Sequence, residues 1–182
     1  MEEKTYRMTV AGLTRDLPLC PINDKLDIAA FIMFGDVEMT IACAAELLKR
    51  VPEFDVILTA EAKGIPLAYE MSRQSGKKYY PARKKAKLYM KQPVEIAVKT
   101  ITTAEEQRLC IDQTELDEMD GKRILIVDDV ISTGGALLAL EAIAHRSNGT
   151  IVGKAAVLAE GDAADRKDII YLEKLPLFFK QA

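Results

Sequence analysis

The chain has 182 residues, 49% of them hydrophobic and 29% charged, and its formal net charge is −3. This composition predicts one hydrophobic core and a single domain over residues 1–182, and the lack of a basic surplus argues against nucleic acid as a partner. No apolar run in the sequence is long enough for a membrane span, and the polar first residues are unlike a secretion signal. We expect a cytoplasmic protein whose three cysteines are reduced.

The first half of the chain predicts helices and strands in alternation. Apolar residues at helical spacing predict helices over residues 27–33 and 36–50, and a following proline ends the second of them. A β-rich run over residues 54–59 then predicts a strand. After a loop, the helix predicted over residues 66–74 can begin at its proline and stop at Gly76.

The second half continues this alternation. Its predicted elements are a strand at 79–82, a hairpin formed by 96–103 and 106–112, a strand from residue 124, a helix at 136–144 and a strand at 152–158. Between the hairpin and the next strand lies a polar stretch, residues 113–122, with no predicted element. The β-loop-α order predicts an α/β fold with a twisted parallel sheet and helices on both faces.

The most informative segment runs from Ile124 to Ala136 and reads ILIVDDVISTGGA. Its first four residues are apolar and mostly β-branched, which is typical of a strand buried on both faces. Asp128 and Asp129 follow at the C-terminal end of this strand, where open α/β sheets bind ligands. Small residues at 132–135 then let backbone N–H groups converge at the start of a helix, an arrangement that binds phosphate.

A carboxylate pair beside such a loop indicates a sugar phosphate as the ligand. Two adjacent acids can accept hydrogen bonds from two vicinal hydroxyls or hold a hydrated Mg²⁺. The alternative is a strand end with a glycine turn and no ligand, which is common in α/β proteins. The second aspartate, Asp129, and the order Ser132-Thr133-Gly134-Gly135 favour a ligand.

Two further groups of residues are predicted at the same edge of the sheet. Lys63 and Gly64 lie in the turn after the strand at 54–59 and place a cation and exposed amides there. The basic run at 83–87 follows the strand at 79–82. Either group could be solvated surface, but their common position favours the binding of a polyanion such as pyrophosphate.

These segments resemble the 5-phosphoribosyl-1-pyrophosphate (PRPP) signature and the flanking motifs of type I phosphoribosyltransferases. The resemblance implies an enzyme of that fold that transfers the phosphoribosyl group of PRPP to a purine base and releases pyrophosphate. The implied PRPP-binding residues are Glu61, Ala62, Lys63, Gly64, Arg83, Lys84, Lys87, Asp128, Asp129, Ser132, Thr133, Gly134, Gly135 and Ala136. The implied catalytic residues among them are Asp128, Asp129, Lys63, Arg83 and Lys87. The implied cofactor is Mg²⁺, held indirectly by Asp128 and Asp129 through water and PRPP.

The resemblance also implies how the chain is divided into structural parts and that it forms an oligomer. It implies a hood built from about residues 1–35 and 159–182, and a flexible catalytic loop over about residues 83–112 that closes over the site. It further implies a homodimer and an unusual cis or flipped peptide just before Lys63. In the adenine-specific branch the phosphate loop usually ends in threonine, so Ala136 lacks one hydroxyl donor to the phosphate.

Three features favour adenine as the base. Residues 175–179 resemble the ending of adenine-specific members, residues 10–18 occupy the hood region that reads adenine, and Glu160 ends the last predicted strand as in the adenine branch. The candidate base-binding residues are Leu13, Arg15 and Glu160. Xanthine-specific members share the loops that contain Lys63 and the basic run, so a xanthine enzyme is an alternative. An orotate enzyme and a non-catalytic PRPP-sensing protein are further alternatives.

Overall fold

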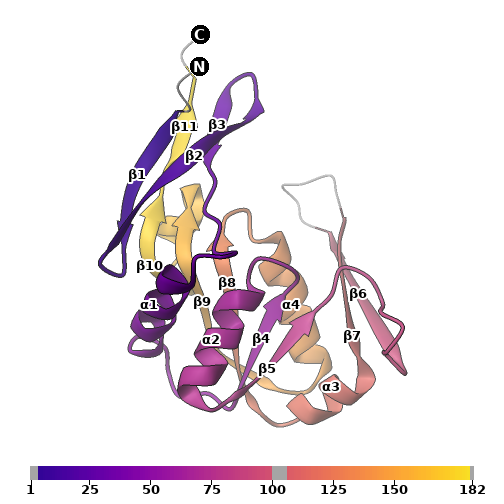
Figure 1. The fold of residues 1–182 in the computed structure, drawn as a ribbon. Coiled ribbons are helices and arrows are strands. Elements are labelled where there is room, and N and C mark those ends of the chain that lie inside the picture. Colours follow the sequence, from indigo (N-terminus) through magenta and orange to yellow (C-terminus); the bar gives the residue numbers. More distant parts are fainter. Residues whose placement is uncertain (1–3, 100–105, 181–182) are drawn as a thin grey trace.

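The computed structural model describes residues 4–99 and 106–180 and contains three sheets (Figure 1). In chain order the elements are β1 (Thr5–Val10), β2 (Leu13–Asn23), β3 (Leu26–Ala29), α1 (Val37–Leu48), β4 (Val56–Ala60), α2 (Ile65–Ser75), β5 (Lys78–Ala82), β6 (Pro93–Lys99), β7 (Glu106–Asp112), α3 (Gln113–Met119), β8 (Arg123–Ile131), α4 (Gly135–Arg146), β9 (Thr150–Glu160), the 3-10 helix η1 (Gly161–Asp165), β10 (Ile170–Leu175) and β11 (Leu177–Phe179). Within these ranges no helix has both the length and the apolar character that a membrane crossing requires.

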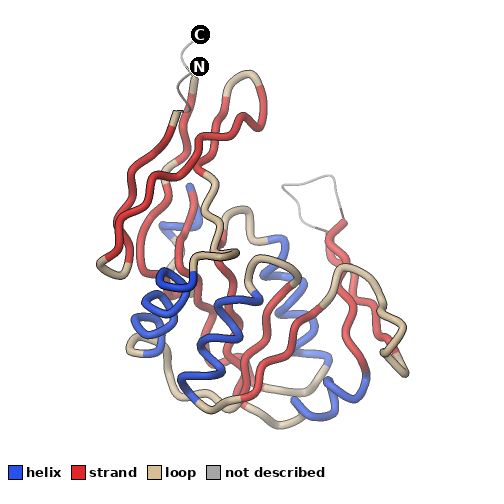
Figure 2. Tube along the Cα trace, viewed as in Figure 1, coloured by secondary structure: helices blue, strands red, loops and turns tan. Residues whose placement is uncertain are grey.

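The central sheet has five parallel strands in the order β10-β9-β8-β4-β5. Successive side chains of a strand point to opposite faces, and β8 shows the result. Leu125 and Val127 pack with the buried side chains of α1 and α2, whereas Ile124 and Ile126 pack with those of α3 and α4. Helices therefore cover both faces (Figure 2), and the predicted α/β fold is confirmed.

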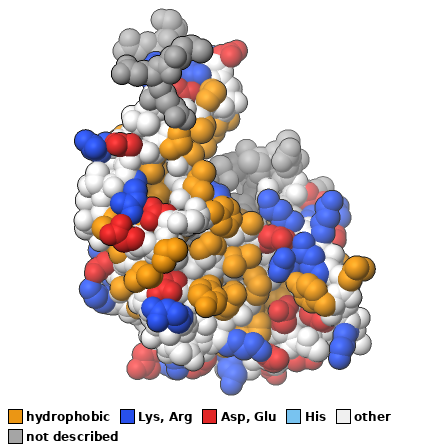
Figure 3. All heavy atoms as spheres, viewed as in Figure 1, with side chains coloured by type: hydrophobic (Ala, Val, Ile, Leu, Met, Phe, Trp, Pro, Cys, Tyr) orange, Lys and Arg blue, Asp and Glu red, His pale blue; other side chains and the backbone are white. Residues whose placement is uncertain are grey.

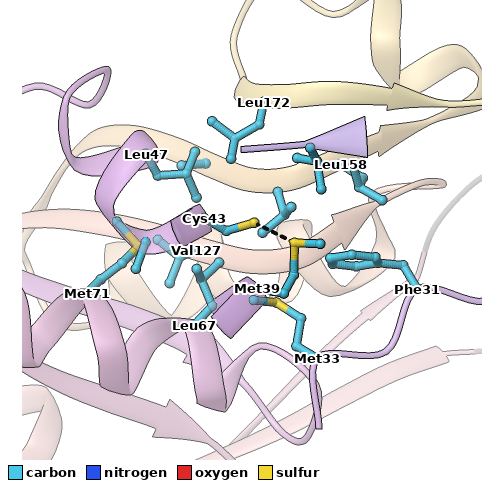
Figure 4. Packing of buried hydrophobic residues seen from close by; sticks show 14 of the residues in the cluster. Phe31, Met33, Met39, Cys43, Leu47, Leu67, Met71, Val127, Leu158 and Leu172 are labelled. Atoms are coloured by element: carbon cyan, nitrogen blue, oxygen red, sulfur yellow. Dashed lines mark hydrogen bonds between the residues drawn. The ribbon is translucent and has the colours of Figure 1, made fainter. Parts of the chain in front are cut away.

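Aliphatic and sulfur-containing side chains fill the space between α1, α2 and the central sheet (Figure 4). Met39, Cys43 and Leu47 from α1 meet Leu67 and Met71 from α2, and each of these side chains is at most 1% exposed. The sulfur of Cys43 lies 3.5 Å from that of Met39. Burial raises the pKa of the Cys43 thiol to about 12, so this cysteine is a packing residue without thiolate chemistry.

Both predicted helices beside this core are confirmed, and their ends follow local rules. The side chain of Asp36 accepts a hydrogen bond from the backbone N–H of Met39 at 3.1 Å and so caps α1. Gly76 ends α2 with a φ of +70°, a left-handed conformation that glycine adopts without steric cost. These residues fix where α1 begins and where α2 ends.

A four-stranded antiparallel sheet, in the order β1-β2-β3-β11, joins the two ends of the chain. In Figure 1 it lies beyond the carboxyl ends of the central strands. The helix predicted over residues 27–33 is wrong, because Leu26–Ala29 form β3, between β2 and β11. Pairing with the preceding strand β2 and with β11, at the other end of the chain, outweighs the helical spacing of a short apolar run.

The segment between the hairpin and β8 contains a helix that was not predicted. Residues 113–119 form α3 inside the polar stretch for which no element was predicted. Asp112 and Glu115 form a capping box at its start, in which the Asp112 N–H donates to the Glu115 carboxylate at 3.1 Å. An Asp followed three residues later by a Glu is a signal for the start of a helix. The helix itself is short and mostly polar, so it lacks the apolar periodicity that predicts the other helices.

Candidate active site

Most of the residues predicted to bind PRPP meet at one edge of the central sheet, where all but Gly64, Arg83 and Lys87 line a hollow. Because β4, β5 and β8 are parallel, their carboxyl ends lie together, and a cleft of about 740 Å³ opens there. Its lining residues are Ala60, Glu61, Ala62, Lys63, Lys84, Glu106, Gln107, Arg108, Leu109, Asp128, Asp129, Val130 and Ala136. A smaller hollow of about 200 Å³ adjoins it, lined by residues 107, 128 and 130–137. The two hollows share Gln107, Asp128, Val130 and Ala136.

Asp128 and Asp129 lie in the C-terminal half of β8 and have very different surroundings. Asp129 is 2% exposed, and its carboxylate lies 3.0 Å from Lys63 Nζ, which comes from the turn after β4. Its backbone N–H donates a hydrogen bond to Asp128 Oδ1 at 2.9 Å. Burial raises the pKa of Asp128 well above its ordinary value, and the neighbouring charge of Asp129 raises it further. The charged form of Asp128 is therefore disfavoured by its surroundings.

Gly64 permits the close approach of the turn after β4 to Asp128. A β-carbon at this position would lie 2.9 Å from Asp128 Oδ1 and closer still to the hydroxyl of the fully buried Thr59. The peptide between Glu61 and Ala62 is cis, so the unusual bond implied just before Lys63 lies one residue earlier. Any side chain larger than hydrogen at residue 64 would have to displace one of the groups that form the cleft.

Glu61 binds three residues of the loop after β5 through its carboxylate. Its carboxylate accepts hydrogen bonds from the Lys84 backbone N–H at 2.9 Å, from Arg83 Nη2 at 3.2 Å and from Lys87 Nζ at 3.3 Å. These bonds, led by that from Lys84, lower the pKa of Glu61 to about 2, so the group is ionised at neutral pH. The predicted pyrophosphate residues from two separate loops are thus held around one point.

The predicted phosphate loop joins β8 to α4 and lines the smaller hollow. Gly134 has a φ of +83° and precedes the first residue of α4, Gly135. This left-handed residue turns the backbone so that the loop leads directly into the amino end of the helix, whose free N–H groups favour an anion. Ser132 and Thr133 are exposed, and Ala136 lies between the two hollows.

The three predicted base-binding residues are not among those that line the two hollows. Arg15 on β2 is bound to the first turn of α1, with Nε 2.7 Å from Asp36 Oδ2 and Nη2 2.9 Å from Glu38 Oε2. This pairing with Arg15 holds the pKa of Asp36 below its usual range. Glu160 is half-buried at the end of β9, and burial raises its pKa. Leu13 begins β2 and is also half-buried.

The structure adds Gln107 and Arg108 on β7, which were not predicted as site residues. Gln107 lines both hollows and faces the same space as Asp128. The hairpin is held to the site because Arg83 and Cys110 exchange two backbone hydrogen bonds, of 2.7 and 2.6 Å. The sequence contains no local signal for this placement, since it depends on how the hairpin folds back. Residues 100–103 of the predicted hairpin lie outside the described residues.

A family model described as the phosphoribosyl transferase domain matches residues 39–177, a range that includes all three loops of this site. The chain belongs to the phosphoribosyl transferase domain family. The matched range contains the carboxylate pair, the loop before α4 and the basic run. Membership confirms the family resemblance that these same segments carry in the sequence.

Known members of the phosphoribosyl transferase family match over different lengths. The adenine phosphoribosyltransferase of Chlorobium phaeobacteroides is 30% identical over 177 residues, covering 90% of this chain and 92% of that protein. That of Cenarchaeum symbiosum is 35% identical over 117 residues, covering 63% of this chain and 66% of that protein.

Solved structures show the same architecture. The crystal structure of adenine phosphoribosyltransferase from Thermoanaerobacter pseudethanolicus matches with a TM-score of 0.70 at 21% identity, covering 87% of this chain and 95% of that one. The Leishmania tarentolae protein of the same name matches with a TM-score of 0.66 at 18% identity, covering 96% of this chain and 83% of that one. At these identities the likeness concerns the fold, which is that of type I phosphoribosyltransferases.

Proposed function

We propose that this protein is a purine phosphoribosyltransferase that converts PRPP and adenine to the nucleoside 5′-monophosphate and pyrophosphate. The observation that carries the proposal is the joined cleft at the sheet edge. Its lining includes the Asp128–Asp129 pair, the loop at 132–136, which has no charged side chain, and the cations Lys63 and Lys84. Sugar hydroxyls, a terminal phosphate and a pyrophosphate are the three parts of PRPP, and each has a matching group of residues there.

Each group of residues has a distinct task in this reaction. The two aspartates accept hydrogen bonds from the ribose hydroxyls and hold the ring, and the loop before α4 binds the 5′-phosphate. The C1–oxygen bond to pyrophosphate breaks while a base nitrogen bonds to C1 and releases its proton. Negative charge then concentrates on the leaving pyrophosphate, so Lys63, Arg83 and Lys87 stabilise the transition state more than the bound substrate. The hairpin that carries Gln107 limits the access of water to the reacting carbon.

Mg²⁺ is the proposed cofactor, and the residues present suit an ion that arrives with PRPP. When bound, it would neutralise part of the pyrophosphate charge. Asp129 already lies 3.0 Å from Lys63 Nζ, and nowhere in residues 4–99 and 106–180 do three or more His, Cys, Asp or Glu side chains form a metal cage. Asp128 and Asp129 would therefore hold the ion through water and PRPP oxygens, as expected for a cation that retains much of its hydration.

A panel of bases tests this function. We expect the purified protein, given PRPP and Mg²⁺, to release pyrophosphate with adenine and much more slowly with xanthine, hypoxanthine, guanine or orotate. Faster release with xanthine would assign the protein to the xanthine branch instead. If PRPP binds but no base is turned over, the PRPP-sensing alternative replaces the enzyme, although the presence of all the leaving-group cations argues against a sensor.

We also propose a homodimer, supported by an apolar surface around the amino ends of α1 and α2. Ile32, Phe34, Val37 and Tyr69 are 53–67% exposed there, and a hollow of about 370 Å³ is lined by the last three of them. Figure 3 shows hydrophobic side chains gathered on this face. Exposed apolar surface of this kind commonly marks a protein interface.

Light scattering after size-exclusion chromatography is expected to give twice the chain mass of 20.2 kDa. Val37→Asp should shift the protein toward the monomer, because it places a charge in this surface without touching the core. A monomeric wild type would contradict the dimer, and a dimeric Val37→Asp protein would place the interface elsewhere. The exposed substitution Glu173→Gln on β10 is the matched control and should leave the mass unchanged.

A further inference from the structure

Arg166 lies against the phosphate loop although it is distant from it in sequence. It follows η1, in the turn that leads toward β10. A β-carbon at Gly134 would lie 3.1 Å from Arg166 Nη1, so the guanidinium occupies the space that a side chain at residue 134 would need. Glycine at this position therefore serves two purposes, since it also adopts the left-handed φ of +83°.

Asp168 holds the guanidinium in this place and leaves one nitrogen free. Arg166 Nε donates to Asp168 Oδ1 at 2.9 Å and Nη2 donates to Oδ2 at 2.7 Å, a two-pronged pair. Lys154 on β9 also contacts Asp168, at 2.5 Å, and Glu141 on α4, at 2.7 Å. Nη1, the nitrogen beside Gly134, has no hydrogen-bond partner among the described residues.

The charges around the two ends of the cleft differ. Lys63, Arg83, Lys84 and Lys87 gather near the proposed pyrophosphate end. The residues of the loop at 132–136 carry no charged side chain, yet a phosphate monoester is mostly a dianion above its second pKa of about 6. Ala136 also supplies no hydroxyl donor to that loop. A guanidinium against Gly134 supplies the missing positive charge from the flank.

We propose that Arg166 belongs to the 5′-phosphate site and strengthens the binding of the phosphate dianion through its charge. This inference rests on the proposed function, in which the loop at 132–136 receives the 5′-phosphate. Arg166 acts across the backbone of Gly134 and is a positioning residue, because it contacts the loop and not the reacting carbon. It affects the phosphoribosyl end of PRPP and leaves the pyrophosphate end unchanged.

Binding of ribose 5-phosphate and of pyrophosphate to the full chain, measured separately by calorimetry, tests this assignment. Arg166→Met is expected to weaken ribose 5-phosphate binding about tenfold, the loss of one modest charge-assisted interaction, with pyrophosphate binding unchanged. Arg166→Lys should recover most of the affinity. In the wild type, ribose 5-phosphate should bind more tightly as pH rises from 5 to 7 and the dianion forms, and Arg166→Met should reduce this gain.

Asp168→Asn is the matched control, since it breaks the same ion pair but keeps the cation. We expect this variant to bind ribose 5-phosphate as tightly as the wild type or more tightly. Equal losses in Arg166→Met and Asp168→Asn would show that the network only supports the fold and would overturn the inference, as would unchanged binding in Arg166→Met. A wild type that binds no ribose 5-phosphate would overturn the proposed function together with the inference, whereas binding without turnover of any base would affect the function alone.

Discussion

Replacing Asp128 with asparagine is expected to slow turnover of PRPP about 10- to 100-fold and at the same time to stabilise the ligand-free protein. The loss of activity follows from removing a charged acceptor for a ribose hydroxyl, which is worth about 1.5–3 kcal/mol. The gain in stability follows from the raised pKa of Asp128, because burial and the neighbouring Asp129 charge make the ionised carboxyl costly in the folded state.

The pH dependence of the melting temperature tests the predicted gain in stability of Asp128→Asn. A carboxyl whose folded pKa lies above its unfolded value destabilises the fold progressively as pH rises from the unfolded pKa through the folded one. The advantage of Asp128→Asn should therefore be present at pH 7 and disappear below about pH 4, where the carboxyl is protonated in both states. A variant that is less stable than the wild type at pH 7 would contradict the assignment.

Asp129→Asn is the matched comparison within the same pair. It should lose turnover to a similar extent but gain no stability, because Asp129 is paired with Lys63 at 3.0 Å and its removal leaves that cation without its partner. Equal stabilisation by both substitutions would mean that the two carboxylates share one environment, contrary to the contacts of Lys63.

Gly64→Ala is the second change for which we expect a large effect. The added methyl group would lie 2.9 Å from Asp128 Oδ1 and against the buried Thr59 hydroxyl, so Asp128 or the turn after β4 must move. Overpacking of this kind costs about 1–3 kcal/mol. Because the displaced group is the proposed ribose ligand, the KM for PRPP should rise at least tenfold, measured by steady-state pyrophosphate release.

Gly12→Ala separates the site effect from general destabilisation. Gly12 has a φ of +78° and nothing within 4 Å of its β-carbon position, so alanine there is strained but meets no neighbour. We expect this variant to lose about 1 kcal/mol of stability with an unchanged KM for PRPP. Full activity of Gly64→Ala with wild-type KM would mean that the turn after β4 does not position Asp128.

The sequence was sufficient to predict the elements whose signals are local. The apolar run of β8, the proline at the start of α2 and the glycine at its end each depend on a few adjacent residues, and all of them are found in the structure. The three loops of the site follow such strands directly. Parallel strands bring their carboxyl ends together, so placing the loops at one edge required only the α/β pattern.

Apart from the short helix α3, the features that were missed depend on contacts between segments that are distant in sequence. β3 resembled a helix because its own residues do not show that it pairs with β11, at the other end of the chain, as well as with the preceding β2. Gln107 enters the cleft only because the hairpin is tied to Arg83 through Cys110. Arg15, predicted to bind the base, is held by Asp36, which caps α1, and by Glu38 in its first turn. A sequence pattern cannot show which carboxylates an arginine will contact.

The most direct test of the proposed PRPP site is a calorimetric titration of the protein with PRPP in the presence of Mg²⁺. If the loops at the ends of β4, β5 and β8 form one PRPP site, we expect one molecule bound per chain, competition by pyrophosphate and by ribose 5-phosphate, and loss of binding in a variant with both Asp128→Asn and Asp129→Asn. Absence of PRPP binding, or equal affinity in that double variant, would contradict the proposed site.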